Sequence, residues 1–322
     1  MLPLTVMSDE LTAIISEIRC DIQSIQDDVN ICRETHFNSR ANALDFIDLH
    51  IIDRINALLP DAPDAELQKL KQGAEKAKHR LEEIDTHLFK RLWEQIRRGG
   101  YTEESFKAMI RKYLGEYLSP PNKVGYDTLD LFINGLLFHR HLPEATIARE
   151  PEMVFYQQTP ARIILELAER ARLMPDDVFF DIGSGLGQVP ILVNLLTGAK
   201  TIGVEYEPAY YSYATACASR LNLTDVTFIN TLAQKGDYAD GSVFFMYTPF
   251  EGTMMQQMLE VLKKESLKRT IRIFTYGPCS PIIARQRWLR CVNGPAEDTY
   301  ILYEFKSRDG NTPTIAPISG TN

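Results

Sequence analysis

The sequence predicts an α/β protein with a parallel sheet in its second half, preceded by an all-helical region. Three observations support this prediction. A strand-like run, Val178 to Ile182, ends in a turn with glycines at 183, 185 and 187, and a helical pattern follows. A second strand-like run, Thr201 to Glu205, ends in a carboxylate. Residues 1–120, in contrast, show only helical periodicity.

The amino-acid composition and net charge limit the classes of protein to which the chain can belong. The chain has 322 residues, of which 44% are hydrophobic and 24% charged, as in soluble globular proteins. The net charge of −8 argues against tight binding to nucleic-acid backbones. Five scattered cysteines indicate reduced thiols, not a disulfide frame or a zinc site. With no signal peptide or membrane-length apolar run in the sequence, we expect a cytoplasmic protein that does not engage a membrane, nuclear residence being the alternative.

The first 120 residues are predicted to form a separate helical domain. Its apolar residues recur at helical spacing, so we expect them to pack into a core. Binding of a partner, or self-association through a spare helix face, is the alternative use of these helices. The stripes are Leu11, Ile14, Ile15, Ile18, Ile22, Ile25 and Val29; Leu44, Ile47, Ile51, Ile52, Ile55 and Leu58; and Leu67, Leu70, Ala74, Ala77, Leu81, Ile84, Leu88 and Leu92. A shorter helix follows from Glu103 to Tyr117.

Residues 121–152 are predicted to be a connecting region with one apolar helix, Leu129 to Phe138. His139 and His141 lie just after this helix. Two histidines in a loop without cysteine or paired carboxylates are too few ligands for a metal ion, and we expect no metal site.

The glycine turn has the chemistry of a nucleoside site. Glycines allow positive φ and leave no Cβ where a ligand approaches the backbone. The spacing G-x-G-x-G, with Asp181 two residues earlier, differs from the G-x-G-x-x-G of dinucleotide folds and from the phosphate loop. Glu205 is placed at the tip of the next strand, where a carboxylate can accept hydrogen bonds from two ribose hydroxyls. A solvated acid at a strand end is the alternative for Glu205.

Further elements complete the predicted sheet. A polar loop, Tyr156 to Thr159, is expected to fold over the cofactor, with Thr159 capping a helix from Ala161 to Arg172. After Glu205, helices and strands alternate and end in two strands beside a turn at Asn293 and Gly294. The predicted ranges are helix 209–221, strand 226–230, strand 242–247, helix 254–264, strand 270–276 and strands 286–292 and 300–305. Residues 307–322 are expected to be a disordered tail.

The fourth strand ends in Tyr247-Thr-Pro-Phe250. This tip is expected to lie opposite the glycine turn, where aromatic faces such as Tyr247 and Phe250 could stabilise a cation and guide a nucleophile. A simple turn at the end of a strand is the alternative reading.

These motifs together resemble a known family. Tyr-Gln-Gln-Thr (156–159), Phe-Phe-Asp-Ile-Gly-Ser-Gly-Leu-Gly-Gln-Val (179–189) and Gly-Val-Glu (203–205) are similar to segments of the disruptor-of-telomeric-silencing type of histone lysine methyltransferases. The resemblance implies a class I, Rossmann-like methyltransferase domain over residues 153–306 and S-adenosylmethionine (SAM) as cofactor. The residues then expected at the cofactor are Tyr156, Gln158, Thr159, Asp181, Gly183, Ser184, Gly185, Gln188 and Glu205. Asn230 and Thr231 are also expected there, although they stand where many methyltransferases use an acid to hold the adenine amino group.

The chain departs from the family on both the cofactor-facing and the substrate-facing side. Gln158 stands where the family has a glutamate, and Tyr247-Thr-Pro-Phe250 replaces an asparagine-rich segment. The resemblance therefore predicts SAM binding more firmly than it predicts the acceptor. We expect direct in-line methyl transfer to a protein lysine, with Tyr247, Phe250 and Tyr156 lining the channel. The alternatives are a small-molecule or amide acceptor, and a helical scaffold whose SAM-binding domain is inactive.

Overall fold

The computed structural model describes residues 4–60, 65–99, 102–115, 125–138 and 141–308. The chain divides into two compact units, one of residues 1–95, 107–121 and 126–136, the other of residues 96–106, 122–125 and 137–322. The predicted domain boundary at residues 120 and 121, His139 and most of the predicted tail lie outside the described residues. Within the described residues, no helix combines the length and apolar character needed to cross a membrane.

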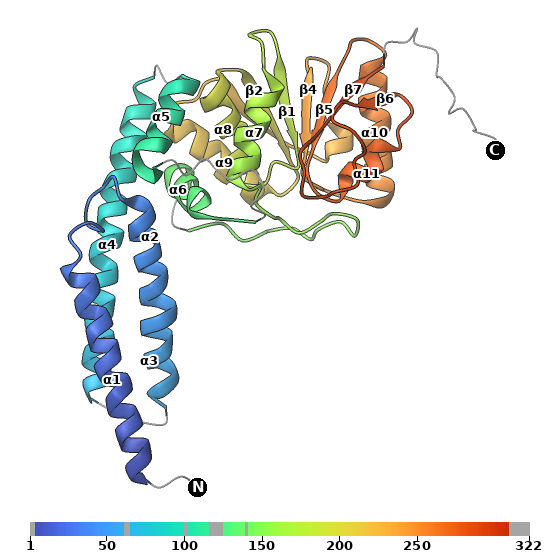
Figure 1. Cartoon of the computed structure of the whole chain (residues 1–322). Helices are drawn as coiled ribbons and strands as arrows, with labels where there is room; N and C mark the ends of the chain where they lie inside the picture. Colours follow the sequence, from blue (N-terminus) through green and yellow to red (C-terminus); the bar gives the residue numbers. More distant parts are fainter. Residues whose placement is uncertain (1–3, 61–64, 100–101, 116–124, 139–140, 309–322) are drawn as a thin grey trace, which may run out of the picture. The chain divides into compact units, whose positions relative to one another are not determined.

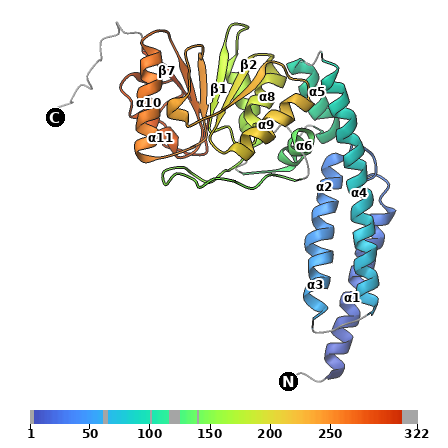
Figure 2. The same ribbon diagram turned by 180° about the vertical axis from the view of Figure 1, so that it is seen from behind.

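The first unit is helical, as predicted. It contains α1 (Leu4–Asp27), α2 (Phe37–Phe46) and α3 (Asp53–Leu58), and most of α4 (Ala65–Arg97), α5 (Glu103–Leu114) and α6 (Thr128–Leu137). One π-helical segment, Ile47–Ile52, joins α2 to α3 without a break. Figures 1 and 2 show α1, α3 and α4 side by side.

The predicted apolar stripes form the core of this unit. Ile18, Ile51 and Leu67 are fully buried in one cluster that joins α1, the α2–α3 helix and α4. The prediction that Val29 belongs to the first buried stripe is wrong. Helix α1 ends at Asp27, so Val29 lies outside the helix and is 70% exposed. A buried arginine, Arg40, orders the loop before α2. Its guanidinium donates to Asp85 and to three carbonyl groups of residues 31–34.

The second unit is built on one seven-stranded sheet with the strand order β3-β2-β1-β4-β5-β7-β6. Strands β1 to β5 run parallel, and β7 is antiparallel to both β5 and β6. The strands are β1 (Val178–Ile182), β2 (Lys200–Glu205), β3 (Val226–Asn230), β4 (Val243–Met246), β5 (Arg272–Thr275), β6 (Leu289–Cys291) and β7 (Tyr303–Ser307). This is the predicted class I methyltransferase arrangement.

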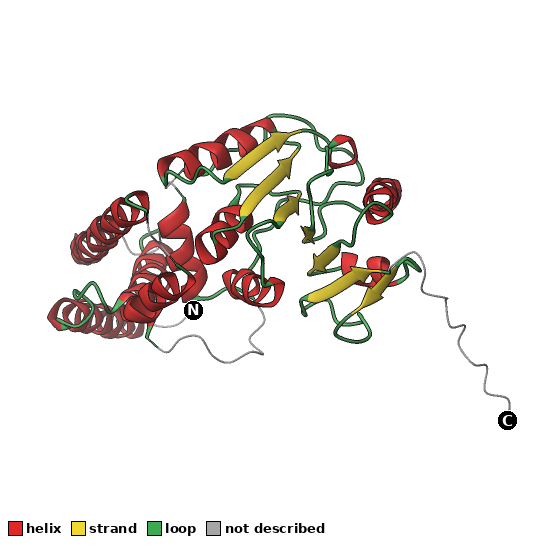
Figure 3. Ribbon diagram, turned by 90° about the horizontal axis from the view of Figure 1, so that it is seen from above, coloured by secondary structure: helices red, strands yellow, loops and turns green. Residues whose placement is uncertain are grey.

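Helices cover both faces of this sheet (Figure 3). They are α7 (Ala161–Ala171), α8 (Gln188–Thr197), α9 (Pro208–Arg220), α10 (Gly252–Ser266) and α11 (Cys279–Ala284). Because both faces are covered, β1 and β4 are almost entirely apolar and buried. Strand order reverses between β1 and β4, and in such sheets the ligand crevice lies at the carboxyl ends of the strands at this reversal.

One local prediction in this unit is wrong and another is confirmed. Thr159 does not cap α7, because Pro160 occupies the cap position and no side chain bonds the helix end there. The predicted ending is confirmed: β6 and β7 pair in antiparallel fashion, and Asn293 and Gly294 lie at the start of the connection between them. Asn293 closes the base of that connection: its amide donates to the Leu302 carbonyl, and its side-chain oxygen accepts from the Glu304 N–H.

Candidate cofactor and methyl-transfer site

The glycine turn after β1 forms the floor of the site. Gly183, Gly185 and Gly187 all have positive φ, between 52° and 83°. The N–H groups of Gly183 and Ser184 both donate to the Val204 carbonyl, which fastens the turn to β2. A Cβ at Gly185 would lie 2.2 Å from the Tyr156 ring, and one at Gly183 would lie 2.5 Å from Pro249. The backbone is therefore approached closely from above, and only glycine fits.

Glu205 lies beside this turn at the end of β2. One carboxylate oxygen accepts from the Gly185 N–H at 2.6 Å, and the other accepts from the Glu207 N–H at 2.8 Å. Burial raises the pKa of Glu205, and the hydrogen bonds from backbone N–H groups offset only part of this effect. The carboxylate is thus fixed in orientation by two donors, and each oxygen keeps lone pairs for a further donor.

Asp181 belongs to β1 and is not part of the cavity lining. Its side chain is 3% exposed, and the pKa of its carboxyl is raised well above the ordinary value by burial and, to a smaller extent, by the nearby charge of Glu205. A raised pKa from burial means that the folded protein disfavours the ionised form of this group.

A segment from Thr146 to Tyr156, which we call the strap, contributes a large part of the cavity lining. At one end, Glu207 accepts hydrogen bonds from the N–H and hydroxyl of Thr146 and from the Ile147 N–H. The same carboxylate caps α9 by accepting from the Ala209 N–H at 3.0 Å. Burial alone would raise the pKa of Glu207, but these hydrogen bonds outweigh it and lower the pKa.

The other end of the strap is fixed to the segment between β4 and α10. The Glu152 carboxylate accepts from the N–H groups of Thr253 and Met254 at 2.9 and 2.7 Å. These two bonds lower the pKa of Glu152. Met153 pairs with Phe250 in a short antiparallel bridge, and the Val154 N–H donates to the Pro249 carbonyl. The strap is therefore held at both ends by carboxylates that accept from backbone N–H groups.

The tip of β4 forms the remaining wall. Thr248 has φ 38°, which is strained for a β-branched residue. Its buried hydroxyl accepts from the Cys279 N–H at the start of α11. Tyr247 packs against Tyr276 with the ring centroids 5.0 Å apart. Strain of this kind persists where the surroundings determine the backbone, and it accumulates at functional sites.

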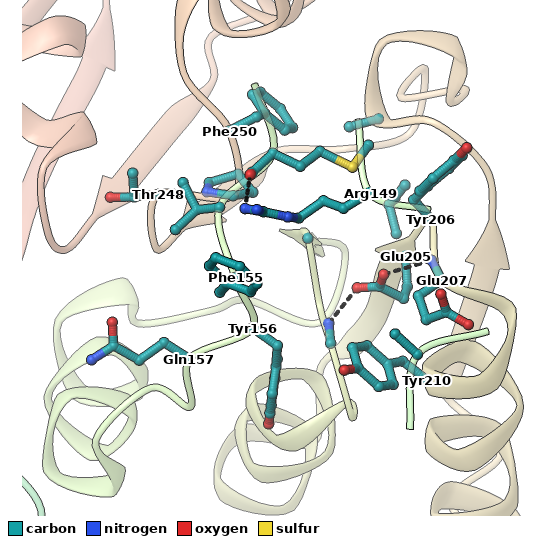
Figure 4. A pocket seen from close by; sticks show the side chains of 18 of the residues that line it. Arg149, Phe155, Tyr156, Gln157, Glu205, Tyr206, Glu207, Tyr210, Thr248 and Phe250 are labelled. Atoms are coloured by element: carbon teal, nitrogen blue, oxygen red, sulfur yellow. Dashed lines mark hydrogen bonds between the residues drawn. The ribbon is translucent and has the colours of Figure 1, made fainter. Parts of the chain in front are cut away.

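One cavity collects these parts (Figure 4). Its lining comes from the strap, the glycine turn, the ends of β2 and β4 and the segments that follow β2 and β3. The lining residues are Ala145, Ile147, Arg149, Met153, Val154, Phe155, Tyr156, Gln157, Gly183, Gly185, Val204, Glu205, Tyr206, Glu207, Tyr210, Thr231, Ala233, Tyr247, Thr248, Pro249 and Phe250.

Comparison with known proteins places this site in a family context. Residues 152–239, which include the strap end, the glycine turn and Glu205, match the family described as histone methylation protein DOT1. This match covers the cofactor half of the sheet, and the strand order adds the class I topology. The chain is a class I SAM-dependent methyltransferase. Over the matched residues it resembles the DOT1 type.

Solved structures of methyltransferases are similar over about half of this chain. An RNA methyltransferase from Salinibacter ruber in complex with S-adenosyl-L-homocysteine (SAH) is 21% identical, with a TM-score of 0.39, over 49% of this chain and 97% of that chain. Precorrin-6y C5,15-methyltransferase from Geobacter metallireducens is 17% identical, with a TM-score of 0.37, over 49% and 92%. Ribosomal protein L11 methylase from Lactobacillus delbrueckii subsp. bulgaricus is 15% identical, with a TM-score of 0.36, over 50% and 83%. No curated protein sequence matches the chain.

The site of this methyltransferase fits SAM. The glycine turn leaves room for a ligand against the backbone, and Glu205 presents a fixed acceptor where a ribose diol would lie. SAM supplies a methyl group already activated on a sulfonium, so the protein has to bind, orient and exclude water.

About half of the residues predicted from the sequence line the cavity, namely Tyr156, Gly183, Gly185, Glu205, Thr231, Tyr247 and Phe250. Asp181 in β1, Ser184 in the turn and Gln188 at the start of α8 do not line it and are buried. Gln158 and Thr159 do not line the cavity; Phe155 and Gln157 of the same loop do. Asn230 is exposed and directs its amide to the carbonyls of Glu205 and Tyr206, so it orders the backbone after β2.

Several lining residues were missed by the sequence analysis. Glu207 had a usable signal, because an acid directly before a proline at the start of a helix is a typical cap. Tyr206 and Tyr210 could have been placed from their distance to Glu205 along the chain. Nothing in the local sequence marks Arg149 or Phe155, since both belong to a segment without regular structure whose course depends on tertiary hydrogen bonds.

Proposed function

We propose that this methyltransferase transfers a methyl group from SAM to the side-chain amine of a protein lysine. The observation that supports the proposal most directly is the match of residues 152–239 to a family whose description is histone methylation. The matched residues contain the glycine turn, Glu205 and the end of the strap, so the resemblance covers the cofactor side of the cavity, whereas the tip of β4 lies outside the match.

The acceptor side of the cavity suits an amine. Tyr247 and Phe250 contribute aromatic surface to the lining beside Thr248 and Pro249. An amine that enters such surroundings loses hydration, which lowers its pKa and favours the neutral, nucleophilic form. Aromatic faces also stabilise the cationic product of the transfer.

The other contribution of the protein is to orient the cofactor and the acceptor. Glu205 and the glycine turn hold the nucleoside, and the β4 tip fixes the side from which the acceptor approaches. The strained Thr248 bonds the start of α11, which makes this wall rigid. Alignment of nucleophile, methyl carbon and sulfur in a preorganised cavity is the main contribution that a protein makes to such a transfer.

The test is methylation of a cell extract with SAM that carries a deuterated methyl group, followed by mass spectrometry of protein digests. The proposal predicts deuterated methyllysine in at least one peptide, absent when the Glu205→Ala variant replaces the wild type. Glu297→Gln is the matched control, because Glu297 is an exposed acid outside the cavity. Label found only in small molecules, in RNA, or on side-chain amides of proteins would contradict a lysine acceptor while leaving methyl transfer itself intact.

A further inference from the structure

Arg149 is the single cationic side chain among the described residues that line the cavity. Its guanidinium carbon lies 3.6 Å from the centroid of the Phe155 ring, and one of its N–H groups donates to the Met153 carbonyl. Stacking on an aromatic face holds the planar guanidinium in a defined orientation. The strap therefore presents a fixed positive charge inside the cavity.

This charge has no carboxylate partner in the part of the chain that the structure describes. The two acids of the lining are engaged elsewhere. Glu205 accepts from the N–H groups of Gly185 and Glu207, and Glu207 accepts from the strap and from α9. A guanidinium has five N–H donors arranged in a fork that matches a carboxylate. One of them is used, so the group can still bind an anion in bidentate fashion.

The position of Arg149 indicates which anion. Figure 4 shows its guanidinium above Phe155, on the side of Thr248 and Phe250 and away from Glu205. If Glu205 holds the ribose, the amino-acid end of the cofactor extends from there across the glycine turn toward this side. SAM has a single carboxylate, and it belongs to that end.

We propose that Arg149 binds the α-carboxylate of SAM, an inference that rests on the methyl transfer proposed above. The Phe155 ring supports the guanidinium from one face while the fork contacts the carboxylate at its edge. The strap thus binds the amino-acid end of the cofactor through Arg149, and Glu205 binds the ribose. The competing explanation is that Arg149 only closes its own turn through the Met153 carbonyl.

Calorimetric titration of the full-length protein distinguishes the two explanations. The ligands are SAH and its decarboxylated analogue, which keeps the adenosine, the sulfur and the amine. The variants are Arg149→Gln, Arg149→Lys and, as a matched control, Arg287→Gln, which removes an exposed arginine outside the cavity. Loss of a charge-assisted contact should weaken SAH binding to Arg149→Gln by about 10- to 100-fold. Binding of the decarboxylated analogue should change by less than about twofold, because it lacks the group that Arg149 contacts.

The remaining outcomes are equally decisive. Arg149→Lys should recover part of the preference for SAH, because it restores charge without the fork, and Arg287→Gln should match the wild type. Equal weakening of both ligands in Arg149→Gln, or weakening of neither, would overturn the carboxylate assignment. If the wild type bound neither ligand, the proposed function would fail instead. Melting curves of each variant confirm folding before titration.

Discussion

At the scale of single residues, two glycines allow the effect of backbone strain to be separated from the effect of space for a ligand: Gly185 in the glycine turn and Gly198 at the end of α8. Gly185 and Gly198 both have positive φ, 52° and 71°, so alanine should cost each about 1–2 kcal/mol of unfolding free energy. They differ in space: an added Cβ meets the Tyr156 ring at Gly185 and nothing within 4 Å at Gly198. We therefore expect both variants to be destabilised, but Gly185→Ala alone to weaken SAH binding, by about tenfold or more.

The measurement combines urea unfolding with calorimetric titration of both glycine variants. Gly198→Ala also places alanine at positive φ, but its Cβ meets no neighbouring side chain, so this variant controls for the loss of stability. Equal SAH affinities in the two variants would show that Tyr156 and the turn can shift without consequence, and would remove the close approach at Gly185 from the account of the site.

At the scale of elements, the strap depends on two carboxylates that accept from backbone N–H groups. Glu207→Ala removes the cap of α9 and the bonds to Thr146 and Ile147. We expect a loss of about 1–2 kcal/mol of unfolding free energy. Hydrogen exchange at residues 146 and 147 should accelerate, because their N–H groups lose their acceptor while the rest of the sheet stays protected.

Glu265→Ala is the control for this experiment. Glu265 is also an acid with a lowered pKa, caused by its hydrogen bonds to Lys268 and Arg269 at the end of α10. Its removal should cost some stability without changing exchange in the strap. Unchanged exchange at residues 146 and 147 in Glu207→Ala would mean that the strap is held by other contacts.

The elements also show what the sequence could and could not predict. Strands β1 and β3 and the turn between β1 and α8 were predicted almost to the residue, because periodicity and glycine placement are local signals. Glu205 was predicted from topology, since parallel strands end at one edge. Asn230 was predicted to contact the cofactor, and this stays a prediction; the structure shows its amide donating to the carbonyls of Glu205 and Tyr206 at the end of β2.

The strap could not be predicted because its course depends on partners distant in sequence. Glu207 fixes residues 146 and 147, and Glu152 fixes residues 253 and 254, through backbone N–H groups that every non-proline residue possesses. Such bonds leave no pattern in side-chain identity. Arg149 enters the cavity only because both ends of the strap are fixed in this way.

At the scale of the whole molecule, four acids at the site make the unfolding free energy depend on pH in opposite directions. The lowered pKa values of Glu152 and Glu207 contribute stability above the ordinary glutamate pKa, and this contribution is lost as the pH falls through the lowered values. Asp181 and Glu205 act in the other direction. Burial raises their pKa values, so the folded state holds protons that the unfolded chain releases. Their ionisation lowers the unfolding free energy as the pH rises from the ordinary to the raised values.

Asp181→Asn tests this balance, since it keeps the shape of the side chain and removes the charge. We expect the variant to have a higher unfolding free energy than the wild type at pH 7 to 8, and the gain to shrink as the pH is lowered toward about 4, the ordinary aspartate pKa. Urea unfolding across this range measures the effect, with Asp225→Asn as the control at an exposed acid. Parallel curves for Asp181→Asn and the wild type would show that the folded protein tolerates the charge without cost. A gain in stability would instead mean that the chain keeps a destabilising acid two residues before its glycine turn, as is common near functional sites, which are rarely at their stability optimum.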